Sequence, residues 1–328
     1  MTECPIPCNL CGASDVEVIG DRDRHGHPLR TTICRQCGLV WSNPRPGEDE
    51  VRRYYSSEYR LDYKGRAMPS LRHIARSGRG ALNRYWALSP YLKRGDRILD
   101  AGAGGGEVVY VLRALGYDAA GLEPDEHYAR HAREALGLPV ATGFVQDATF
   151  PPDTFDVVTM YHALEHVEDP AAILSRLRGW MVDRGVLLIE VPNVEAVCIA
   201  PEHRFHFAHF YNFSREALEG LGRKAGFDPV ETTTSADGGN LVTVFRAARP
   251  ERALSGIATA AQFDAANHAR VAAAVKGHTS WSYYRSAAPY TGPFRRLRTY
   301  LADRRAAHGC KTPKQVLDKL IEAHVYSR

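Results

Sequence analysis

The sequence predicts an α/β fold in which a doubly wound parallel sheet follows a small cysteine-rich module and precedes a helical tail. Between residues 97 and 249, short apolar segments alternate with helical patterns, which is typical of parallel strands joined by crossover helices. A glycine-rich turn follows the first of these segments, as in sheets that bind a nucleotide at their C-terminal edge. Two Cys-x-x-Cys pairs lie before this region, and an alanine- and arginine-rich segment follows it.

Composition and charge exclude several classes of protein. The 328 residues are 44% hydrophobic and 24% charged, as in ordinary globular proteins. A net charge of +4, from 42 basic and 38 acidic residues, argues against a nucleic-acid partner, which usually requires a strongly basic face. No apolar run approaches the length of a transmembrane helix, and the first residues do not resemble a secretory signal. We therefore expect a cytoplasmic protein without a membrane span.

Residues 1–46 are predicted to form a metal-binding module. They contain two pairs of cysteines, Cys8 with Cys11 and Cys34 with Cys37, and a glycine follows each pair. Two intervening residues let both sulfurs of a pair point to one centre, and glycine allows a positive φ after the pair. Two such pairs complete a tetrahedral Cys4 site suited to zinc. Because all four ligands come from the protein, we expect a structural role; iron in a rubredoxin-like site is the main alternative.

Two segments connect this module to the sheet. A polar stretch over residues 16–32, with a turn near His25 and His27, is predicted to form a hairpin between the cysteine pairs. Residues 47–96 are predicted to form a mainly helical linker that is rich in tyrosine. Tyr59 and Tyr63 are candidates for a lid over a bound cofactor, and packing in the core is the alternative interpretation.

Residues 97–249 form the predicted cofactor domain. A short strand ends at Asp100, and a glycine-rich turn over residues 100–106 leads into a helix that begins at Glu107. A second strand ends at Glu123, where a carboxylate is placed to accept hydrogen bonds from both hydroxyls of a ribose. The GxGxxG fingerprint of dinucleotide sites is not met, because Glu107 occupies its last position.

The turn reads Asp-x-Gly-x-Gly-x-Gly and resembles motif I of the class I S-adenosylmethionine-dependent methyltransferases. The resemblance implies a Rossmann-like sheet, S-adenosylmethionine as cofactor, and an aspartate near the methionine part of that cofactor. It also implies that the acid after the third strand, Asp147, reaches the adenine amino group. The cofactor-binding residues predicted in this way are Asp100, Gly102, Gly104, Gly106, Glu123, Asp147, Ala148 and Tyr161.

Histidines suited to base catalysis are concentrated in two segments, residues 161–166 at a strand end and residues 203–214 in a loop. A hydroxyl acceptor needs a base, and imidazole titrates near neutral pH. The candidate catalytic residues are His209, His166 and His206, whereas we interpret His162 as a packed strand-end residue. Asp169, followed by a proline, is predicted to open one helix, and Ser214 is predicted to cap the helix after the loop.

The cysteine module, the class I pattern and the histidine loop together resemble the deoxysugar C-methyltransferases and related enzymes of bacterial glycan and natural-product clusters. In those enzymes a Glu-His pair in the loop supplies the base; His209 matches the histidine, but Ala208 replaces the acid. His166 matches their strand-end histidine, and residues 237–240 resemble a later substrate-side turn. Because the loop acid is missing, we expect methylation of a sugar hydroxyl, in a nucleotide-linked sugar, a glycan or a glycosylated natural product.

Other interpretations stay open at this point. A sugar C-methyltransferase and an RNA base methyltransferase are alternative enzymes, and a zinc-module assembly protein is a non-enzymatic alternative. Residues 250–328 are predicted to form a helical extension. The arginines within residues 295–298 and 304–305 either contact substrate phosphates or form a solvated helix face. The extension is also a candidate lid or homodimer contact.

Overall fold

The computed structural model describes residues 5–45, 69–248 and 265–326, so the proposed lid residues Tyr59 and Tyr63 lie outside the described ranges. The contacts within the chain divide it into two compact units. Unit 1 comprises residues 1–47 and 161–292, and unit 2 comprises residues 48–160 and 293–328. Both units are therefore made of two segments that are distant in the sequence.

Unit 2 contains the parallel strands of the larger sheet. β4 (Arg97–Ala101), β5 (Asp118–Glu123), β6 (Val140–Thr142) and β7 (Phe155–Tyr161, whose last residue belongs to unit 1) follow the order β7-β4-β5-β6. Each neighbouring pair in this order is parallel. The helices α4 (Glu107–Ala114) and α5 (Glu126–Leu136) follow the first two strands. The predicted doubly wound arrangement is confirmed in this unit.

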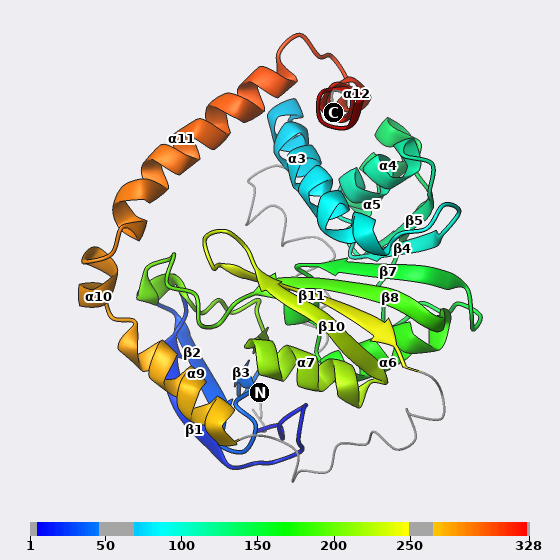
Figure 1. The fold of residues 1–328 in the computed structure, drawn as a ribbon. Helices are drawn as coiled ribbons and strands as arrows, with labels where there is room; N and C mark the ends of the chain where they lie inside the picture. The colour runs from blue at the N-terminus through cyan, green and yellow to red at the C-terminus, as the bar shows by residue number, and fades with distance from the viewer. Residues whose placement is uncertain (1–4, 46–68, 249–264, 327–328) are drawn as a thin grey trace. The chain divides into compact units, whose positions relative to one another are not determined.

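The end of the tail packs into unit 2. α12 (Pro313–Ile321) contacts α3 (Leu71–Leu88) and also α4 and α5, as Figure 1 shows. Val316 and Leu317 of α12 are fully buried. Gly78 of α3 allows this approach, since a Cβ at this position would lie 2.6 Å from Leu317 Cδ2.

Two short helical turns complete the described part of this unit. A 3-10 helix (Ser89–Tyr91) follows α3 directly and leads towards β4. A π-helical turn (Glu322–Tyr326) follows α12 and ends the described chain.

Unit 1 contains a four-stranded antiparallel sheet in the order β1-β2-β3-β9. β1 (Val16–Arg22) and β2 (Pro28–Cys34) form the predicted hairpin, and β3 (Val40–Ser42) follows the second cysteine pair. β9 (Tyr211–Asn212) comes from the histidine-rich loop and pairs with β3. The cysteine module and the histidine loop therefore belong to one sheet.

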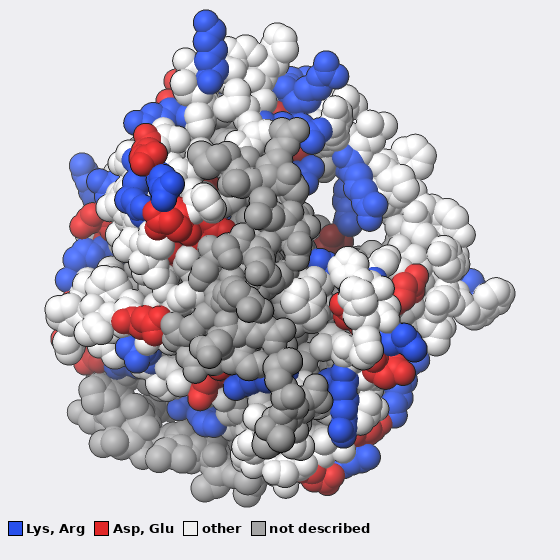
Figure 2. All heavy atoms as spheres, turned by 180° about the vertical axis from the view of Figure 1, so that it is seen from behind, with Lys and Arg blue, Asp and Glu red and all other residues white. Residues whose placement is uncertain are grey.

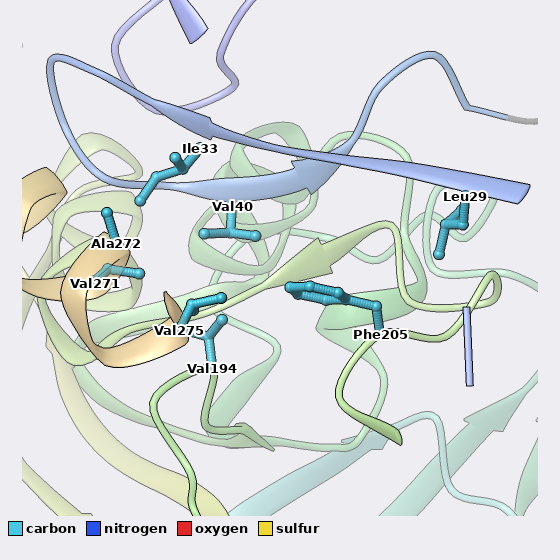
Figure 3. Packing of buried hydrophobic residues seen from close by; sticks show 8 residues of the cluster. All are labelled: Leu29, Ile33, Val40, Val194, Phe205, Val271, Ala272 and Val275. Atoms are coloured by element: carbon cyan, nitrogen blue, oxygen red, sulfur yellow. The ribbon is translucent and has the colours of Figure 1, made fainter. Parts of the chain in front are cut away.

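A helix of the tail covers this small sheet. α9 (Ala265–Gly277) contacts β1 and β2, and its Val271, Ala272 and Val275 belong to a buried apolar cluster (Figure 3). The other members of this cluster come from the hairpin, β3 and the loops after β8: Leu29, Ile33, Val40, Val194 and Phe205. Phe205 anchors the histidine loop in this core, because it is 8% exposed and lies one residue before His206.

The remaining strands of the larger sheet also belong to unit 1. β8 (Met181–Pro192), β11 (Asn240–Ala247) and β10 (Phe227–Thr234) follow the order β10-β11-β8, and both neighbouring pairs are antiparallel. Asp169 caps α6 (Pro170–Trp180) and Ser214 caps α7 (Arg215–Lys224), which confirms both predicted helix starts. Two short 3-10 helices, Leu164–His166 and Pro201–His203, lie in the two histidine-rich segments.

The predicted helical tail is confirmed over residues 265–326, where α10 (Ser280–Tyr284) and α11 (Ala288–Ala307) lie between α9 and α12 in the sequence. Basic and acidic side chains are interspersed among the described residues of the face in Figure 2, in keeping with the small net charge. Within the described ranges, no helix has the length and hydropathy needed to cross a membrane.

Candidate functional site

The four predicted metal ligands converge in unit 1. One ligand atom from each of Cys8, Cys11, Cys34 and Cys37 lies within 4.8 Å of the others. Cys8 Sγ lies 3.4 Å from Cys37 Sγ, and Cys11 Sγ lies 3.5 Å from Cys34 Sγ. Sulfurs at the corners of a tetrahedron with bonds of about 2.3 Å are separated by about 3.8 Å. The donor set and its spacing therefore fit a tetrahedral zinc ion.

The backbone after each cysteine pair adopts the predicted left-handed conformation. Gly12 has a φ of +79° and Gly38 a φ of +73°. Gly38 also lies against α9, where Asn267 donates a hydrogen bond to the Cys37 carbonyl over 2.6 Å. A Cβ at Gly38 would lie 2.6 Å from the Asn267 side chain. The second cysteine pair is therefore fixed both by its own turn and by the tail helix.

In unit 2 the glycine turn and Glu123 meet directly. Gly104 N–H donates to Glu123 Oε2 over 2.7 Å, and Asp125 N–H donates to Glu123 Oε1 over 3.1 Å. Glu123 is 4% exposed, so its carboxylate is held beside the turn by backbone donors. This is the geometry expected for a carboxylate that accepts ribose hydroxyls next to a loop that binds the rest of the cofactor.

Asp100 occupies the end of β4 and is 2% exposed. Its Oδ1 accepts a hydrogen bond from the Thr159 hydroxyl of β7 over 2.8 Å. Burial raises the pKa of Asp100 to about 6, although the Thr159 hydrogen bond opposes this shift. Asp100 is therefore tied to the neighbouring strand at the edge of the sheet where the glycine turn begins.

The other predicted cofactor residues fall in two places. Asp147 and Ala148 form a turn after β6, where both N–H groups donate to the Phe144 carbonyl at 3.1 Å. Asp147 is exposed, and it belongs to the same unit as Glu123. Tyr161 is 6% exposed and belongs to unit 1, so it is not grouped with the glycine turn.

The three candidate catalytic histidines lie together in unit 1. The His166 and His209 ring centroids are 4.9 Å apart, and those of His206 and His209 are 5.3 Å apart. Nδ1 of His166 lies 2.8 Å from the Ala208 carbonyl oxygen, and Ala208 N–H donates to His206 Nδ1 over 3.1 Å. The loop backbone thus orients two of the three imidazoles.

The small sheet holds this loop at both ends. Arg24 N–H, in the turn after β1, donates to the Phe205 carbonyl over 2.8 Å. Ser42 N–H of β3 donates to the Phe210 carbonyl over 2.9 Å. The two candidate catalytic histidines of the loop, His206 and His209, lie between these two anchors. The cysteine module therefore contributes directly to the position of the candidate base.

Burial keeps His206 and His209 neutral. It lowers the pKa of His209 to about 3, with a further contribution from the nearby His166. It lowers the pKa of His206 to about 4, with Arg24 as the next cause. A neutral imidazole retains the lone pair that a base or a metal ligand needs.

Sequence reasoning did not identify Glu165, although this residue lies within the histidine cluster. Glu165 is 1% exposed, and its Oε1 lies 3.8 Å from His166 Nε2. One ligand atom from each of Glu165, His166 and His209 lies within 4.8 Å of the other two. The only signal in the sequence was an acid directly before His166, and such a neighbour does not reveal contact with the loop.

His162 links this acid to a second one. Its Nδ1 lies 3.3 Å from Glu165 Oε1 and its Nε2 lies 3.1 Å from Glu190 Oε1. Burial alone would lower the pKa of His162, but the two carboxylates outweigh it and raise the pKa to about 9. Glu190 also accepts a hydrogen bond from Asn240 over 3.1 Å, so the polar network reaches the turn over residues 237–240.

Comparisons with known proteins find methyltransferases over the central part of the chain. A family model described as a methyltransferase domain matches residues 71–232. An uncharacterized methyltransferase of Schizosaccharomyces pombe is 28% identical over 153 residues, which are 42% of this chain and 54% of that protein. A ubiquinone biosynthesis O-methyltransferase of Actinobacillus pleuropneumoniae is 32% identical over 110 residues, which are 30% of this chain and 47% of that protein.

Among solved structures, the magnesium protoporphyrin IX methyltransferase of Synechocystis PCC 6803 with bound SAH is similar at a TM-score of 0.49 and 17% identity. The match covers 61% of this chain and 99% of that one. The chain spans about half the length of the two curated relatives named above.

Proposed function

We propose that the protein is an S-adenosylmethionine-dependent methyltransferase that methylates a sugar hydroxyl with a histidine as general base. The match of residues 71–232 to a methyltransferase domain supports the methyl transfer. The observation that carries the proposed methyl transfer is the contact between Gly104 N–H and the buried Glu123 carboxylate. It joins the glycine turn, whose spacing distinguishes this site from a dinucleotide site, to the acid that is placed to accept the ribose hydroxyls. The histidine cluster of unit 1 supplies the candidate base.

The residues of unit 2 fit the cofactor. In this proposal the Glu123 carboxylate accepts the ribose hydroxyls and the exposed Asp147 accepts the adenine amino group. Asp100, which the Thr159 hydroxyl holds in place, lies at the start of the turn near the methionine part. When bound, S-adenosylmethionine supplies an electrophilic methyl group, so the protein must chiefly orient the acceptor and exclude water.

His209 takes the proton of the acceptor hydroxyl as its oxygen gains the methyl group. The imidazole is neutral at pH 7, because burial lowers its pKa to about 3. The rings of His166 and His206 both lie next to it in the cluster. The segment with His166 follows β7 directly in the sequence, and β7 ends at the edge of the sheet where parallel strands bind their ligands.

A sugar is the proposed acceptor because the chain resembles enzymes that methylate deoxysugars and because several polar side chains converge in the histidine cluster. Transfer to oxygen needs one base, and position 208 of the loop is alanine instead of the acid found in the C-methyltransferases. We propose that zinc at the four cysteines is structural, since four thiolates leave no ligand position open and the module fixes the loop that carries His209.

The test is transfer of label from S-adenosylmethionine to a panel of nucleotide-linked sugars and, separately, to bulk RNA. We expect a labelled sugar with the methyl group on oxygen, identified by NMR of the product. His209→Ala should lower kcat by about 10²- to 10⁴-fold, the usual contribution of a general base, with the Kd for the cofactor unchanged.

His27→Ala is the matched control, because His27 lies in the exposed hairpin turn with 76% of its side chain accessible. It should retain wild-type activity. Transfer to RNA, or full activity in both His209→Ala and His166→Ala, would contradict the proposed acceptor or mechanism. A methyl group on carbon would support the sugar but reject the hydroxyl.

A further inference from the structure

We propose that Glu165 is a positioning residue. Its buried carboxylate orients His166 and stabilises the positive charge that the histidine cluster gains when it takes the proton of the substrate hydroxyl. This inference rests on the proposed function, since it assigns a role within the same reaction. Glu165 supplies the carboxylate that the loop lacks, because residue 208, beside His209, is alanine.

The position of Glu165 is unusual for a carboxylate. It lies in the 3-10 helix Leu164–His166 and is 1% exposed. Among the described residues, neither of its oxygens finds a hydrogen-bond donor with good geometry. Its electrostatic partners are imidazoles: His162 Nδ1 at 3.3 Å and His166 Nε2 at 3.8 Å, with His209 in the same cluster. A buried carboxylate without such partners would be strongly destabilising.

The hydrogen bonding of His166 shows which nitrogen faces the acid. A carbonyl oxygen can only accept, so Nδ1 of His166 donates its hydrogen to Ala208 over 2.8 Å. Nε2 then faces Glu165. In neutral His166 this nitrogen would direct a lone pair at a carboxylate, which is repulsive; with a proton it forms a favourable ion pair. The arrangement therefore favours the protonated state that a base reaches during the reaction.

The surroundings keep Glu165 ionised. Burial would raise its pKa, but the interactions with His166 and His162 outweigh burial and lower the pKa to about 2. On the other side of His162 lies the second carboxylate, Glu190. The negative charge of Glu165 is therefore present beside His162 and His166 throughout the neutral pH range.

The hairpin turn contributes the other charged groups near the cluster. Arg24 and Asp23 act on His206 with opposite signs, since the guanidinium lowers its pKa and the carboxylate raises it. The His25 ring lies edge-on to His206 with centroids 6.0 Å apart. These groups act mainly on His206. The protonation of Glu165 therefore depends on the imidazoles beside it, His162 and His166.

The proton balance is simple. The acceptor hydroxyl loses one proton to His209 as its oxygen forms the bond to the methyl group, and the methyl–sulfur bond breaks. His209 then carries a positive charge within the cluster that contains the anionic Glu165. Stabilising that charge lowers the barrier, as the buried aspartate of a serine protease triad does for its histidine.

The experiment is Glu165→Gln, which keeps the shape of the side chain and removes its charge. We expect kcat to fall by about 10²-fold or more while the KM for S-adenosylmethionine is unchanged. The acidic limb of the pH profile of kcat/KM should move to lower pH, because the imidazolium loses its counter-charge. A change of fold alone would not move this limb.

Glu195→Gln is the matched control, since it removes a carboxylate of the same unit whose described ion pair is with Arg270. It should leave both kcat and the acidic limb unchanged. If Glu165→Gln turns over within about 3-fold of wild type with an unshifted limb, the positioning role is wrong.

A second readout does not need turnover. In histidine NMR of the ¹⁵N-labelled protein, the titration midpoint of His166 should move to lower pH in Glu165→Gln and stay in place in Glu195→Gln. If the wild type transfers no methyl group to any acceptor but this shift occurs, the proposed function fails and the coupling stands. A metal ion bound by wild type beyond the Cys4 site and lost in Glu165→Gln would make Glu165 a ligand and overturn the inference.

Discussion

Among the individual residues, His162 shows how the site uses an unfavourable conformation. Its φ is +50°, in the left-handed region that a non-glycine residue adopts at a cost of about 1–3 kcal/mol. The conformation places its ring between Glu165 and Glu190, and the two ion pairs offset the strain. The sequence favours a packing role for His162, because a strand-end histidine carries no signal of the acids that surround it.

Gly106 shows why the glycine turn tolerates no side chain at its end. It precedes α4 with a φ of +84°, and a Cβ there would lie 2.7 Å from Leu138 Cδ1 and 3.0 Å from Ala132 Cβ. Both neighbours are buried. Alanine would therefore meet backbone strain and a steric clash at the same position.

We predict that Gly106→Ala lowers the free energy of unfolding by about 1–3 kcal/mol and weakens S-adenosylmethionine binding. Urea denaturation and calorimetric titration measure the two effects. Gly80→Ala is the control: Gly80 lies within α3 with nothing within 4 Å of its would-be Cβ, so alanine should be neutral or stabilise the helix by up to about 1 kcal/mol. If Gly106→Ala and Gly80→Ala are equally stable, the proposed strain and steric clash at Gly106 are wrong.

Among the strands and helices, the pairing of β3 with β9 connects the cysteine module to the candidate base. Val40 pairs with Asn212 and Trp41 with Tyr211, directly after the loop that carries His209. A small hairpin such as β1–β2 buries little apolar surface by itself, so the metal is expected to supply part of its stability. Loss of the metal should therefore affect the loop as well as the module.

We predict that Cys34→Ser removes almost all of the zinc that wild type binds at the Cys4 site. The amides of Tyr211 and Asn212 should then exchange with solvent faster, because their partner strand is no longer held. Metal analysis and hydrogen–deuterium exchange measure these outcomes. Cys310→Ser, in the tail, should change neither. If exchange at Tyr211 and Asn212 is unchanged in a zinc-free variant, the cysteine module does not stabilise the histidine loop.

For the molecule as a whole, the two units carry different groups of candidate site residues. The glycine turn, Glu123 and Asp147 belong to unit 2, whereas the cysteines and the histidine cluster belong to unit 1. Each unit also combines segments from both halves of the chain, as the packing of α12 against α3 shows for unit 2. The cofactor and the metal should therefore stabilise different parts of the protein.

We predict that S-adenosylmethionine slows amide exchange in residues 100–106 and 123–125 of unit 2. Glu123→Gln should raise the Kd for the cofactor about 10-fold or more, because a charged acceptor forms hydrogen bonds stronger by about 1–2 kcal/mol than a neutral one. Glu126→Gln is the control, since Glu126 forms a surface ion pair with Arg130. Equal cofactor affinity of Glu123→Gln and wild type would remove Glu123 from the site.

Features that involve short spacing could be predicted from the order of the residues alone. The cysteine pairs, the glycine turn with Glu123, the caps at Asp169 and Ser214 and the alternation of strands and helices are all of this kind. The turn after each cysteine pair and the two caps follow from local backbone rules, and the spacing of the motifs indicates which further segments meet at the metal and cofactor sites. The domain boundaries and the roles of individual site residues stay predictions.

Which distant segments meet could be learned only from the packed chain. The contact of Glu165 and His166 with the loop at His209, the pairing of β9 with β3 and the docking of α12 at Gly78 all join residues far apart in the sequence. No periodicity or motif encodes such contacts, because they depend on how complete elements pack and on which buried charges find partners. For this reason the histidines were identified from the sequence, whereas the acid among them was not.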